Sequence, residues 1–477
     1  MKSSLSRQLG AAMIITRREV RDQFRDWRII FPVLGLTVFF PFLMNFTAQQ
    51  MLGFVNRYGA GILGERLVPF LLMIVGFFPI SVSLVIALES FVGEKERGSI
   101  EPLLNTPLAD WQLYLGKLVA ATIPPLFSSF TGMAVYLVGL ALVGVPIPEL
   151  PLLVQIVALS IVQAVMMVSG AVVVSTQATS VRAANLLASF IIIPSAFLIQ
   201  GESVVMFWGN YQTLWWAVFG LAVLSVLLVR VGLAHFQREE LLGREIDVLN
   251  VRWMAGAFWQ RFSGGAGNVR RWYTQTLPAT LGELRLPILL ALFLAVIGVW
   301  VGVQQVQRFY IPLDNLSIET LQERLHTLVQ IWPTFSVRPV LGIWLNNVRV
   351  MAIAMLLGMF SFGIIGQIPL IATMAVSGYL FGLLSTAGLP VWGYLLFVLP
   401  HGVIEVPAAV IATAAVLRAG ALIATPLPDK TVGEVWLMAL ADWFKVMIGL
   451  VLPLLLVAAM IEAWVTPQIV LFLFHQF

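Results

Sequence analysis

The stretch ESFVGEKERGSIEPLLNTPLADWQLYLGK, residues 89–117, decides how the first half of this chain is organised. It is polar and charged, and it lies between two long apolar segments. A loop of this kind is held near the face of a membrane, where a protein in the cytoplasm can contact it. We therefore interpret it as a candidate contact point for a partner that supplies energy.

The composition places most of the chain in lipid. Hydrophobic residues make up 59% of the 477 residues and charged residues only 11%, against roughly 25% charged in an ordinary soluble domain. Since no soluble arrangement hides that much apolar surface, we predict an all-α polytopic membrane protein with about ten helical crossings. The chain contains no cysteine, which excludes disulfides, thiolate metal sites and a cysteine nucleophile.

The first half contains six apolar runs, each near the ~20 residues that cross a bilayer core. They cover residues 29–46, 67–88, 118–143, 152–174, 183–199 and 214–229. Prolines inside these runs are compatible with membrane helices, because neighbouring helices satisfy the freed carbonyl groups. We therefore predict a six-helix transmembrane domain over residues 1–235.

Lysine and arginine mark one side of these six runs. Eighteen of them occupy the loops of that side, within residues 1–28, 92–117, 182 and 235–285. The alternate loops carry two, Arg57 and Arg66. By the positive-inside rule, this contrast places both ends of the first half, including the N-terminus, in the cytoplasm.

Residues 10–28 are predicted to form an amphipathic helix that lies at the membrane interface. Apolar side chains share one face of it: Leu9, Met13, Val20, Phe24 and Trp27. Arginines spread over the other face. The alternative is a basic flank that only follows the positive-inside rule. No small-residue cleavage site follows the first apolar run, so we do not expect a signal peptide.

A basic linker, residues 236–280, follows the first half and is expected in the cytoplasm. It contains Gly264-Gly265-Ala266-Gly267, which is typical of a domain boundary. Its arginines are interleaved with aromatic residues. Beside a membrane span this pattern is typical of anchoring at the interface, so we expect no nucleic-acid partner.

Residues 281–477 are predicted to form a second bundle of about five transmembrane helices. In order, we expect a crossing, a polar loop, an uncharged stretch, a second polar loop and a last crossing, over residues 286–303, 304–349, 351–404, 417–445 and 446–461. The uncharged stretch is too long for one crossing. Breaks at Gln367-Ile368-Pro369 and Gly388-Leu389-Pro390 divide it into about three helices.

The charged loop of the first half resembles that of the type-2 ABC transporter permease family. The matching residues are Glu89, Gly93-Glu94, Arg97 to Leu104, Thr106-Pro107 and Gly116-Lys117. In that family the loop has the form E-x-x-x-G-[ST]-[IV]-E-x-L-L-x-T-P, followed by G-K. The resemblance covers residues 1–235 and implies a six-helix permease in the plasma membrane of a prokaryotic cell.

In this family the loop is a coupling element that seats in a groove of the ATP-binding subunit. The resemblance therefore implies contact with an ATPase at Glu94, Arg97, Gly98, Glu101, Leu104, Pro107 and Asp110. Gly98 is suited to break a helix, Glu101-Pro102 to begin a new one, and Asp110 to cap the next. An ordinary re-entry loop without a partner is the alternative.

The chain has no phosphate-binding loop of its own. Gly116-Lys117 is followed by Leu118, and no G-x-x-x-x-G-K-[ST] pattern occurs. We therefore expect this chain to bind no cofactor and not to be an enzyme, with ATP and Mg²⁺ bound by two copies of a separate ATPase. Two ATPase subunits imply a dimer of permeases, and membrane lipids are the remaining partner.

The second half resembles the stage II sporulation protein M family. The matching residues are Leu345-Asn346-Asn347, Leu399 to Glu405 and Ile461 to Pro467, and the resemblance covers about residues 260–470. Where relatives often have Asn-Gly in a middle helix, this chain has Ser377-Gly378, so a contact of that amide is absent or replaced. The family's founding member takes part in cell-envelope remodelling within a membrane complex.

His401 and Glu405 are spaced i, i+4 and therefore share one face of a helix. Ionisable groups inside a membrane are costly and usually face a bundle interior or a cavity. We predict an intramembrane polar site formed by Asn346, Asn347, His401, Glu405 and Glu462. Its role is a structural clasp, a proton or polar-substrate site, or a metal site. We assign no metal, because no second histidine accompanies the two residues at helical spacing.

Together these features predict the permease subunit of an ATP-driven ABC exporter with a fused second membrane domain. Residues 93–117 would transmit the movement of the ATPases to the six-helix bundle. The alternatives are a non-transporting membrane scaffold for envelope remodelling and an intramembrane enzyme that uses His401 and Glu405. The enzyme has no further support, since no H-E-x-x-H or G-x-S-x-G pattern is present. Lipids, peptides, ions and polysaccharides all fit as substrates, and homodimer and heterodimer both remain open.

Overall fold

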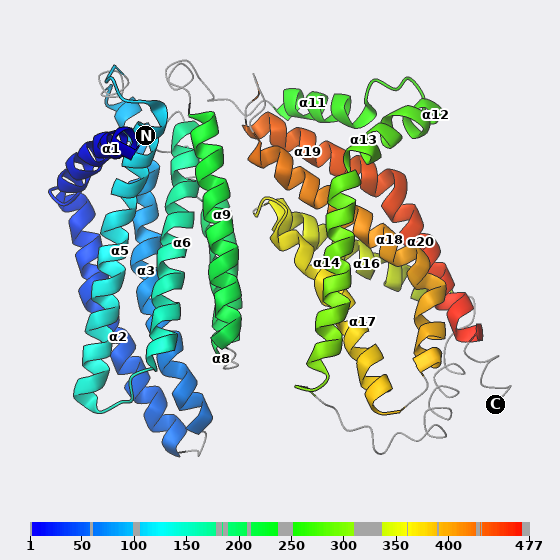
Figure 1. Cartoon of the computed structure of the whole chain (residues 1–477), viewed down its shortest axis with the longest axis horizontal. Helices are drawn as coiled ribbons and strands as arrows, with labels where there is room; N and C mark the ends of the chain where they lie inside the picture. The colour runs from blue at the N-terminus through cyan, green and yellow to red at the C-terminus, as the bar shows by residue number, and fades with distance from the viewer. Residues whose placement is uncertain are drawn as a thin grey trace. The chain divides into compact units, whose positions relative to one another are not determined.

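The structure, a computed structural model, consists of helices joined by turns and loops (Figure 1). The described residues are 2–57, 61–98, 105–177, 184, 189–207, 211–236, 251–309, 336–359, 361–388, 391–425, 430 and 432–469. Within them, eight helices are long and apolar enough to cross a membrane, and two shorter apolar helices accompany these. The prediction of an all-α polytopic membrane protein is therefore confirmed.

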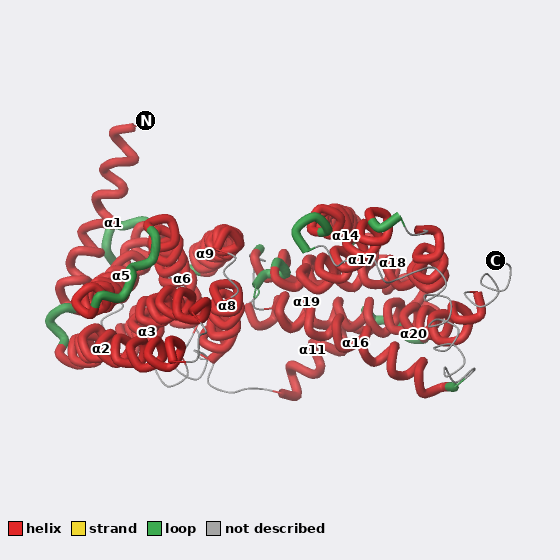
Figure 2. The backbone as a smooth tube through the Cα atoms, turned by 90° about the horizontal axis from the view of Figure 1, so that it is seen from below, coloured by secondary structure: helices red, strands yellow, loops and turns green. Residues whose placement is uncertain are grey.

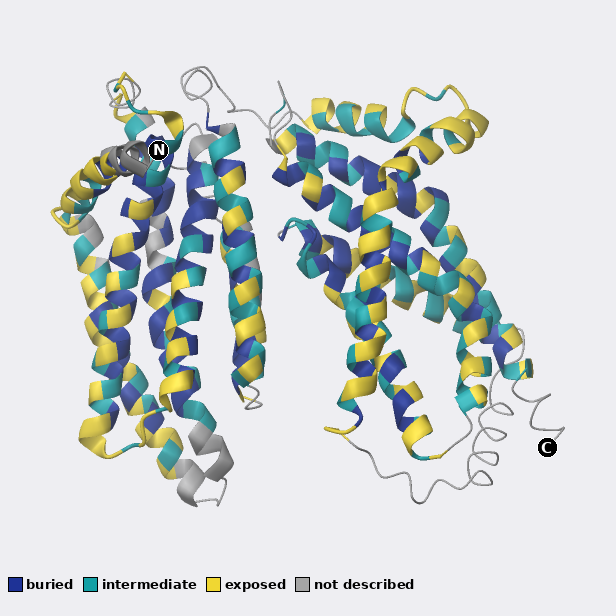
Figure 3. Cartoon of the chain, viewed as in Figure 1, coloured by how far each residue is buried: buried dark blue, intermediate teal, exposed yellow. Residues whose placement is uncertain are grey.

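The chain divides into two compact units, Met1–Leu249 (unit 1) and Asn250–Phe477 (unit 2). Unit 1 is a helical bundle with one helix across its end. The helices of the bundle are α2 (Trp27–Arg57), α3 (Gly61–Glu96), α5 (Asp110–Val143), α6 (Leu150–Gln177), α8 (Ser189–Phe207) and α9 (Leu214–His235). Helix α1 (Lys2–Gln23) runs across the bundle axis and packs on α5 (Figure 2). Buried residues are concentrated along α3, α5 and α6, and α3 and α6 lie in the middle of the bundle (Figure 3).

Helix α1 covers most of the amphipathic helix predicted over residues 10–28, but it ends at Gln23, and Trp27, predicted on its apolar face, begins α2 instead. One side of it packs on α5, where Thr16 Oγ1 donates a hydrogen bond of 3.0 Å to the carbonyl of Gly116. Met13 and Phe24, on the predicted apolar face, remain 61% and 44% exposed. An apolar face left outside the bundle is what a helix at a membrane interface requires.

Unit 2 is a bundle with short helices at one end (Figure 1). The short helices are α11 (Val251–Ser263), α12 (Val269–Arg271) and α13 (Leu277–Glu283), and they lie in the second part of the predicted linker. The bundle contains α14 (Arg285–Gln305), α16 (Val337–Met359), α17 (Ile368–Thr386), α18 (Val391–Ala424), α19 (Val432–Val446) and α20 (Leu452–Met460). π-Helical turns, η4 (Met447–Val451) and η5 (Ile461–Val465), continue α19 and α20 as one helical run. The bundle thus contains five helical segments that can cross a membrane.

Helices α14 and α17 approach each other closely through glycine. A Cβ atom at Gly302 would lie 1.9 Å from the carbonyl oxygen of Ala375, and one at Gly378 would lie 2.1 Å from that of Val299. Small residues permit such close backbone contact between membrane helices. Ser377, which replaces the family's asparagine, lies with its Oγ 2.7 Å from the hydroxyl of Tyr394, so a different polar contact occupies this position.

The predicted breaks in the uncharged stretch fall at helix junctions. Helix α17 begins at Ile368 after a tight turn in which Phe362 and Gly363 adopt φ values of 50° and 84°. It ends at Thr386, and Gly388, at φ 69°, precedes the start of α18. Both breaks are confirmed.

The two polar loops predicted in this half are wrong in part. Helix α16 begins at Val337, inside the expected loop 304–349. Helices α18 and α19 occupy most of the expected loop 417–445. The charge of α19 is neutralised within the protein, because Asp442 lies 3.0 Å from Lys445 and 2.6 Å from Arg261 of α11. Paired charges of this kind let the helix continue where a count of charges predicts a loop.

Candidate functional site

The predicted coupling loop is described on both flanks, whereas Glu101 and Leu104 lie outside the described residues. On the first flank, α3 ends at Glu96, and Gly98 turns the chain with φ 67°. A positive φ favours glycine, which fits its predicted role as a helix breaker. On the second flank, Pro107 is exposed just before α5.

Helix α5 begins at Asp110, an exposed carboxylate that complements the positive end of the helix. The side chain of Gln112 caps this end, since its Oε1 accepts a hydrogen bond of 2.9 Å from the backbone N–H of Ala109. Arg97 is 72% exposed, and its guanidinium is 3.9 Å from the carboxylate of Glu89. An exposed pair at this distance contributes little to stability, so Arg97 is presented at the surface rather than locked in the fold.

A buried lysine joins three helices at the base of this loop. Lys117 of α5 is 1% exposed, and its Nζ lies 3.0 Å from Glu94 of α3 and 3.4 Å from Glu19 of α1. The same ammonium donates a hydrogen bond of 2.8 Å to the carbonyl of Ser90. A buried charge is tolerated only when it is paired and hydrogen-bonded, and here both conditions are met.

Burial dominates the electrostatics of Glu94. It raises the pKa of the Glu94 carboxyl above its ordinary value, and the neighbouring Lys117 ammonium opposes this rise. Glu94 was a predicted coupling residue, whereas Glu19 was not predicted. The amphipathic pattern did not assign Glu19 to either face, and only the packing of α1 on α5 brings it to Lys117.

Helix α3 is also hydrogen-bonded to α6. Ser175 of α6 accepts hydrogen bonds of 3.1 Å from the backbone N–H groups of Phe91 and Val92, and it donates one of 2.6 Å to the carbonyl of Leu88. Tyr114 of α5 is fully buried nearby, with its ring 5.9 Å from that of Phe236. The base of the loop is therefore a packed junction of α1, α3, α5 and α6.

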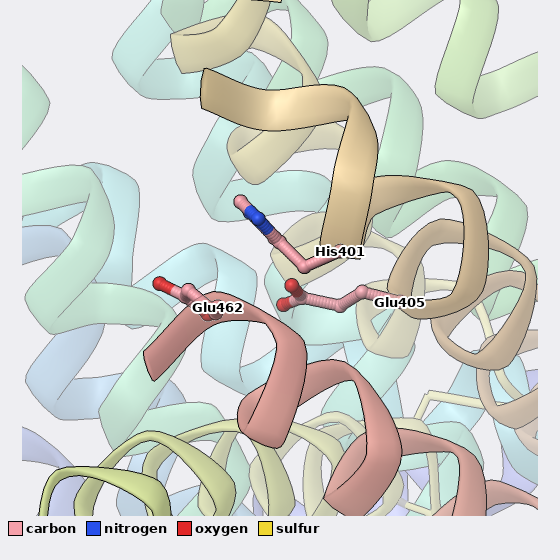
Figure 4. Close-up of side chains that lie close together, drawn as sticks. All are labelled: His401, Glu405 and Glu462. Atoms are coloured by element: carbon pink, nitrogen blue, oxygen red, sulfur yellow. The ribbon is translucent and has the colours of Figure 1, made fainter. Parts of the chain in front are cut away.

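Unit 2 contains a cluster of ionisable side chains. His401 and Glu405 of α18 and Glu462 of η5 lie together, and one nitrogen or oxygen atom of each lies within 4.8 Å of the other two (Figure 4). Asn347 of α16 donates a hydrogen bond of 2.9 Å to Glu405 Oε1. His401 Nδ1 is 3.4 Å from the hydroxyl oxygen of Thr466. The cluster therefore joins three helical segments that are distant in the sequence.

Local backbone features position these side chains. Helix α18 contains Pro400 immediately before His401 and Pro407 shortly after Glu405, and each proline removes one helical hydrogen bond. Glu462 lies in the π-helical turn η5, a feature that often occurs at functional sites. The indole of Trp464 in the same turn donates a hydrogen bond of 3.0 Å to the carbonyl of Ser336, which fixes the turn against the start of α16.

The structure brings four of the five predicted polar residues together. Asn346 is the exception, because it is exposed on α16 while Asn347 reaches Glu405. Thr466 was not predicted, although it follows Glu462 by one helical turn, the spacing that puts two side chains on one face. An imidazole and two carboxylates can hold a cation or share a proton.

A further buried carboxyl group lies in unit 1. Glu202 of α8 is 5% exposed, and its Oε2 accepts a hydrogen bond of 2.7 Å from Gln163 of α6. Glu202 was not predicted as a site residue, although an acidic residue between apolar segments is a signal that can be read from the sequence. Its neutral partner makes it a link between α6 and α8 rather than an ion pair.

Each half of the chain matches a known protein family. Residues 13–210 match the family model described as ABC-2 family transporter protein. Residues 288–467 match the family model described as Stage II sporulation protein M. An uncharacterized protein of Methanocaldococcus jannaschii is 27% identical over 190 residues, which cover 40% of this chain and 99% of that protein. No solved structure matches the chain.

The two resemblances noted in the sequence are thereby confirmed. The first match includes the coupling loop, and the second includes Asn347, His401, Glu405 and Glu462. This chain is a multi-pass membrane protein whose residues 13–210 match the ABC-2 family transporter protein and whose residues 288–467 match Stage II sporulation protein M.

Proposed function

We propose that this chain is the permease subunit of an ATP-driven exporter, coupled through residues 93–117 to two copies of a separate ATPase. The match of residues 13–210 to the ABC-2 family transporter protein supports a membrane permease domain in unit 1 and implies association with ABC ATP-binding subunits. The proposal adds the site of coupling, the direction of transport, a permease dimer, and a plasma-membrane location with the N-terminus in the cytoplasm.

The junction at Lys117 is the observation that carries this proposal. Lys117 ties α5 to Glu94 of α3 and to Glu19 of α1. Helices α3 and α5 flank the loop, so a force on the loop acts on both of them. Separating the ammonium from its partners would leave buried charges unpaired, which costs about 3–5 kcal/mol. The three helices therefore move together when the loop is displaced.

The mechanism that follows is mechanical. Closure of the ATPase subunits displaces the loop, and the junction passes this movement to α1, α3 and α5. Since α3 lies in the middle of the bundle and packs on α2, α5, α6 and α8, its movement changes the packing of most of unit 1. The substrate then crosses or leaves the membrane through the rearranged bundle.

The test is purification of the full-length chain, tagged, from its native membranes, with mass spectrometry of the retained proteins. Glu101→Lys reverses a charge in the loop. Glu149→Lys makes the same substitution at an exposed residue just before α6, at the opposite end of α5, and serves as the control. We expect wild type and control to retain an ATP-binding subunit in stoichiometric amount, and Glu101→Lys to lose it.

Two results would overturn the proposal. One is retention of the ATP-binding subunit by Glu101→Lys at the wild-type level. The other is recovery of the wild-type chain without any ATP-binding subunit but with cell-wall enzymes, which would favour the envelope scaffold. Gel filtration of each variant shows whether a loss of partner reflects a loss of fold.

A further inference from the structure

We propose that His401, Glu405 and Glu462 bind a divalent transition-metal cation of the zinc type. The sequence alone led to no metal assignment, because no second histidine accompanies His401 and Glu405 at their helical spacing. The fold places the carboxylate of Glu462, already a member of the predicted polar site, within 4.8 Å of these two side chains and so supplies a third ligand. This site is separate from the coupling function proposed for unit 1.

Two neighbouring carboxylates make this cluster suited to binding a cation. Glu405 and Glu462 lie next to each other, and among the residues that the structure describes, neither forms an ion pair with lysine or arginine. His401 is 8% exposed. The fold places its imidazole beside the two carboxylates. One divalent cation neutralises both of them and accepts a lone pair from the imidazole.

The ligand types select the class of metal. Imidazole nitrogen together with carboxylate oxygen suits Zn²⁺ and neighbouring first-row ions, whereas Mg²⁺ and Ca²⁺ prefer oxygen alone. Ligand atoms around a tetrahedral Zn²⁺ lie about 3.4 Å apart, so small side-chain rotations suffice to close the cluster around an ion. Three protein ligands leave one position open to water or to another ligand.

The surroundings hold the ligands in place. Thr466 lies 3.4 Å from His401 Nδ1, which leaves Nε2 of the imidazole available to a metal. Asn347 holds one oxygen of Glu405 at 2.9 Å and leaves the other oxygen unoccupied by that bond. Partners of this kind orient metal ligands and set the tautomer of histidine. The π-helical turn η5 and the hydrogen bond of Trp464 position Glu462 independently of α18.

The site lies within the bundle. His401 is ten residues after the start of α18 at Val391, which corresponds to about 15 Å along the helix. Glu405 and Glu462 are only partly buried, so the cluster is not sealed from an entering ion. A bound cation would join α18 to η5 and, through Asn347, to α16.

The test measures metal binding by the full-length chain purified in detergent. Metal content is determined by mass spectrometry, and the chain stripped with chelator is then titrated with Zn²⁺ and with Co²⁺. We expect about one Zn²⁺ per chain. We also expect Co²⁺ to give visible d–d absorption bands that Zn²⁺ abolishes. This wild-type measurement stands even if a variant fails to fold.

Substitutions then assign the ligands. His401→Gln and Glu462→Gln are expected to weaken Zn²⁺ binding by at least tenfold, and Thr466→Val by roughly 10–100-fold through loss of orientation. Asn346→Ala, at the exposed neighbour of Asn347, is the matched control and should bind as wild type. Absence of stoichiometric Zn²⁺ from wild type would overturn the proposal and favour a shared proton. Equal binding by wild type and by folded Glu462→Gln would overturn it too.

Discussion

Replacing Lys117 by methionine tests the junction on which the proposed coupling depends. The substitution keeps the length and apolar stem of the side chain and removes its charge. Lys117 is 1% exposed, whereas the carboxylates of Glu94 and Glu19 are each 20% exposed. Loss of one partner from a buried pair costs about 3–5 kcal/mol. Because both carboxylates keep some contact with solvent, we expect the lower end, about 3 kcal/mol.

The effect should depend on pH in a direction that the structure defines. Burial raises the pKa of Glu94 above its ordinary value, and Lys117 opposes that rise. Because the pKa of Glu94 is higher in the folded than in the unfolded state, the contribution of this one group to stability is fully present at low pH. That contribution is lost as pH rises through the folded-state pKa. Without Lys117, the pKa of Glu94 is raised further above its ordinary value. The defect of Lys117→Met should therefore be smaller at pH 5, where Glu94 is more protonated, than at pH 8.

Thermal unfolding of the full-length chain in detergent measures this prediction, with amide hydrogen exchange to locate the change in unit 1. A loss of about 3 kcal/mol lowers the melting temperature by roughly 6–12 °C for a unit of this size, and exchange should increase around Ser90 and Lys117. Arg97→Met is the matched control, since its 72% exposed side chain predicts a change within about 0.5 kcal/mol. An unchanged melt at pH 8, or a defect that grows as pH falls, would refute the reasoning.

Two further substitutions test the packing and charge pairing of unit 2. Gly302→Val should destabilise the α14–α17 contact by about 1–3 kcal/mol, because a Cβ would lie 1.9 Å from the carbonyl oxygen of Ala375. Amide hydrogen exchange that is unchanged in α14 and α17 would contradict the close approach of the two helices. Asp442→Ala removes the partner shared by Arg261 and Lys445 and should cost about 3 kcal/mol, measured by thermal unfolding. A melting temperature equal to wild type would show that these charges do not hold α11 on α19.

The membrane-spanning layout could be predicted from the sequence because lipid demands long apolar helices. The junctions at residues 367–369 and 388–390 also followed from proline and glycine in the uncharged stretch. The start of α16 and the extent of α19 did not follow, since a count of charges treats each charge as solvated. Besides Lys445 on its own helix, Asp442 has a partner on α11, Arg261, which is far away in the sequence, and only the tertiary fold supplies that second pairing.

In the candidate sites, too, local spacing could be predicted from the sequence, whereas contacts between helices could not. Helical spacing alone put His401 and Glu405 on one face, and the structure keeps them together. The choice between Asn346 and Asn347 depends on the rotation of α16 about its axis, and the sequence pattern did not decide it. Thr466 lies beside His401 only because the helical run ending in η5 packs against α18.

The two units treat neighbouring carboxylates differently. In unit 1, Glu19 and Glu94 share a lysine from a third helix, so the protein supplies its own cation. In unit 2, Glu405 and Glu462 have an imidazole and an amide beside them, and among the described residues neither is paired with lysine or arginine. The first arrangement is complete without a ligand and suits a permanent mechanical joint. The second has no lysine or arginine partner within the described residues, and for that reason we place an exchangeable ligand in unit 2 and a fixed link in unit 1.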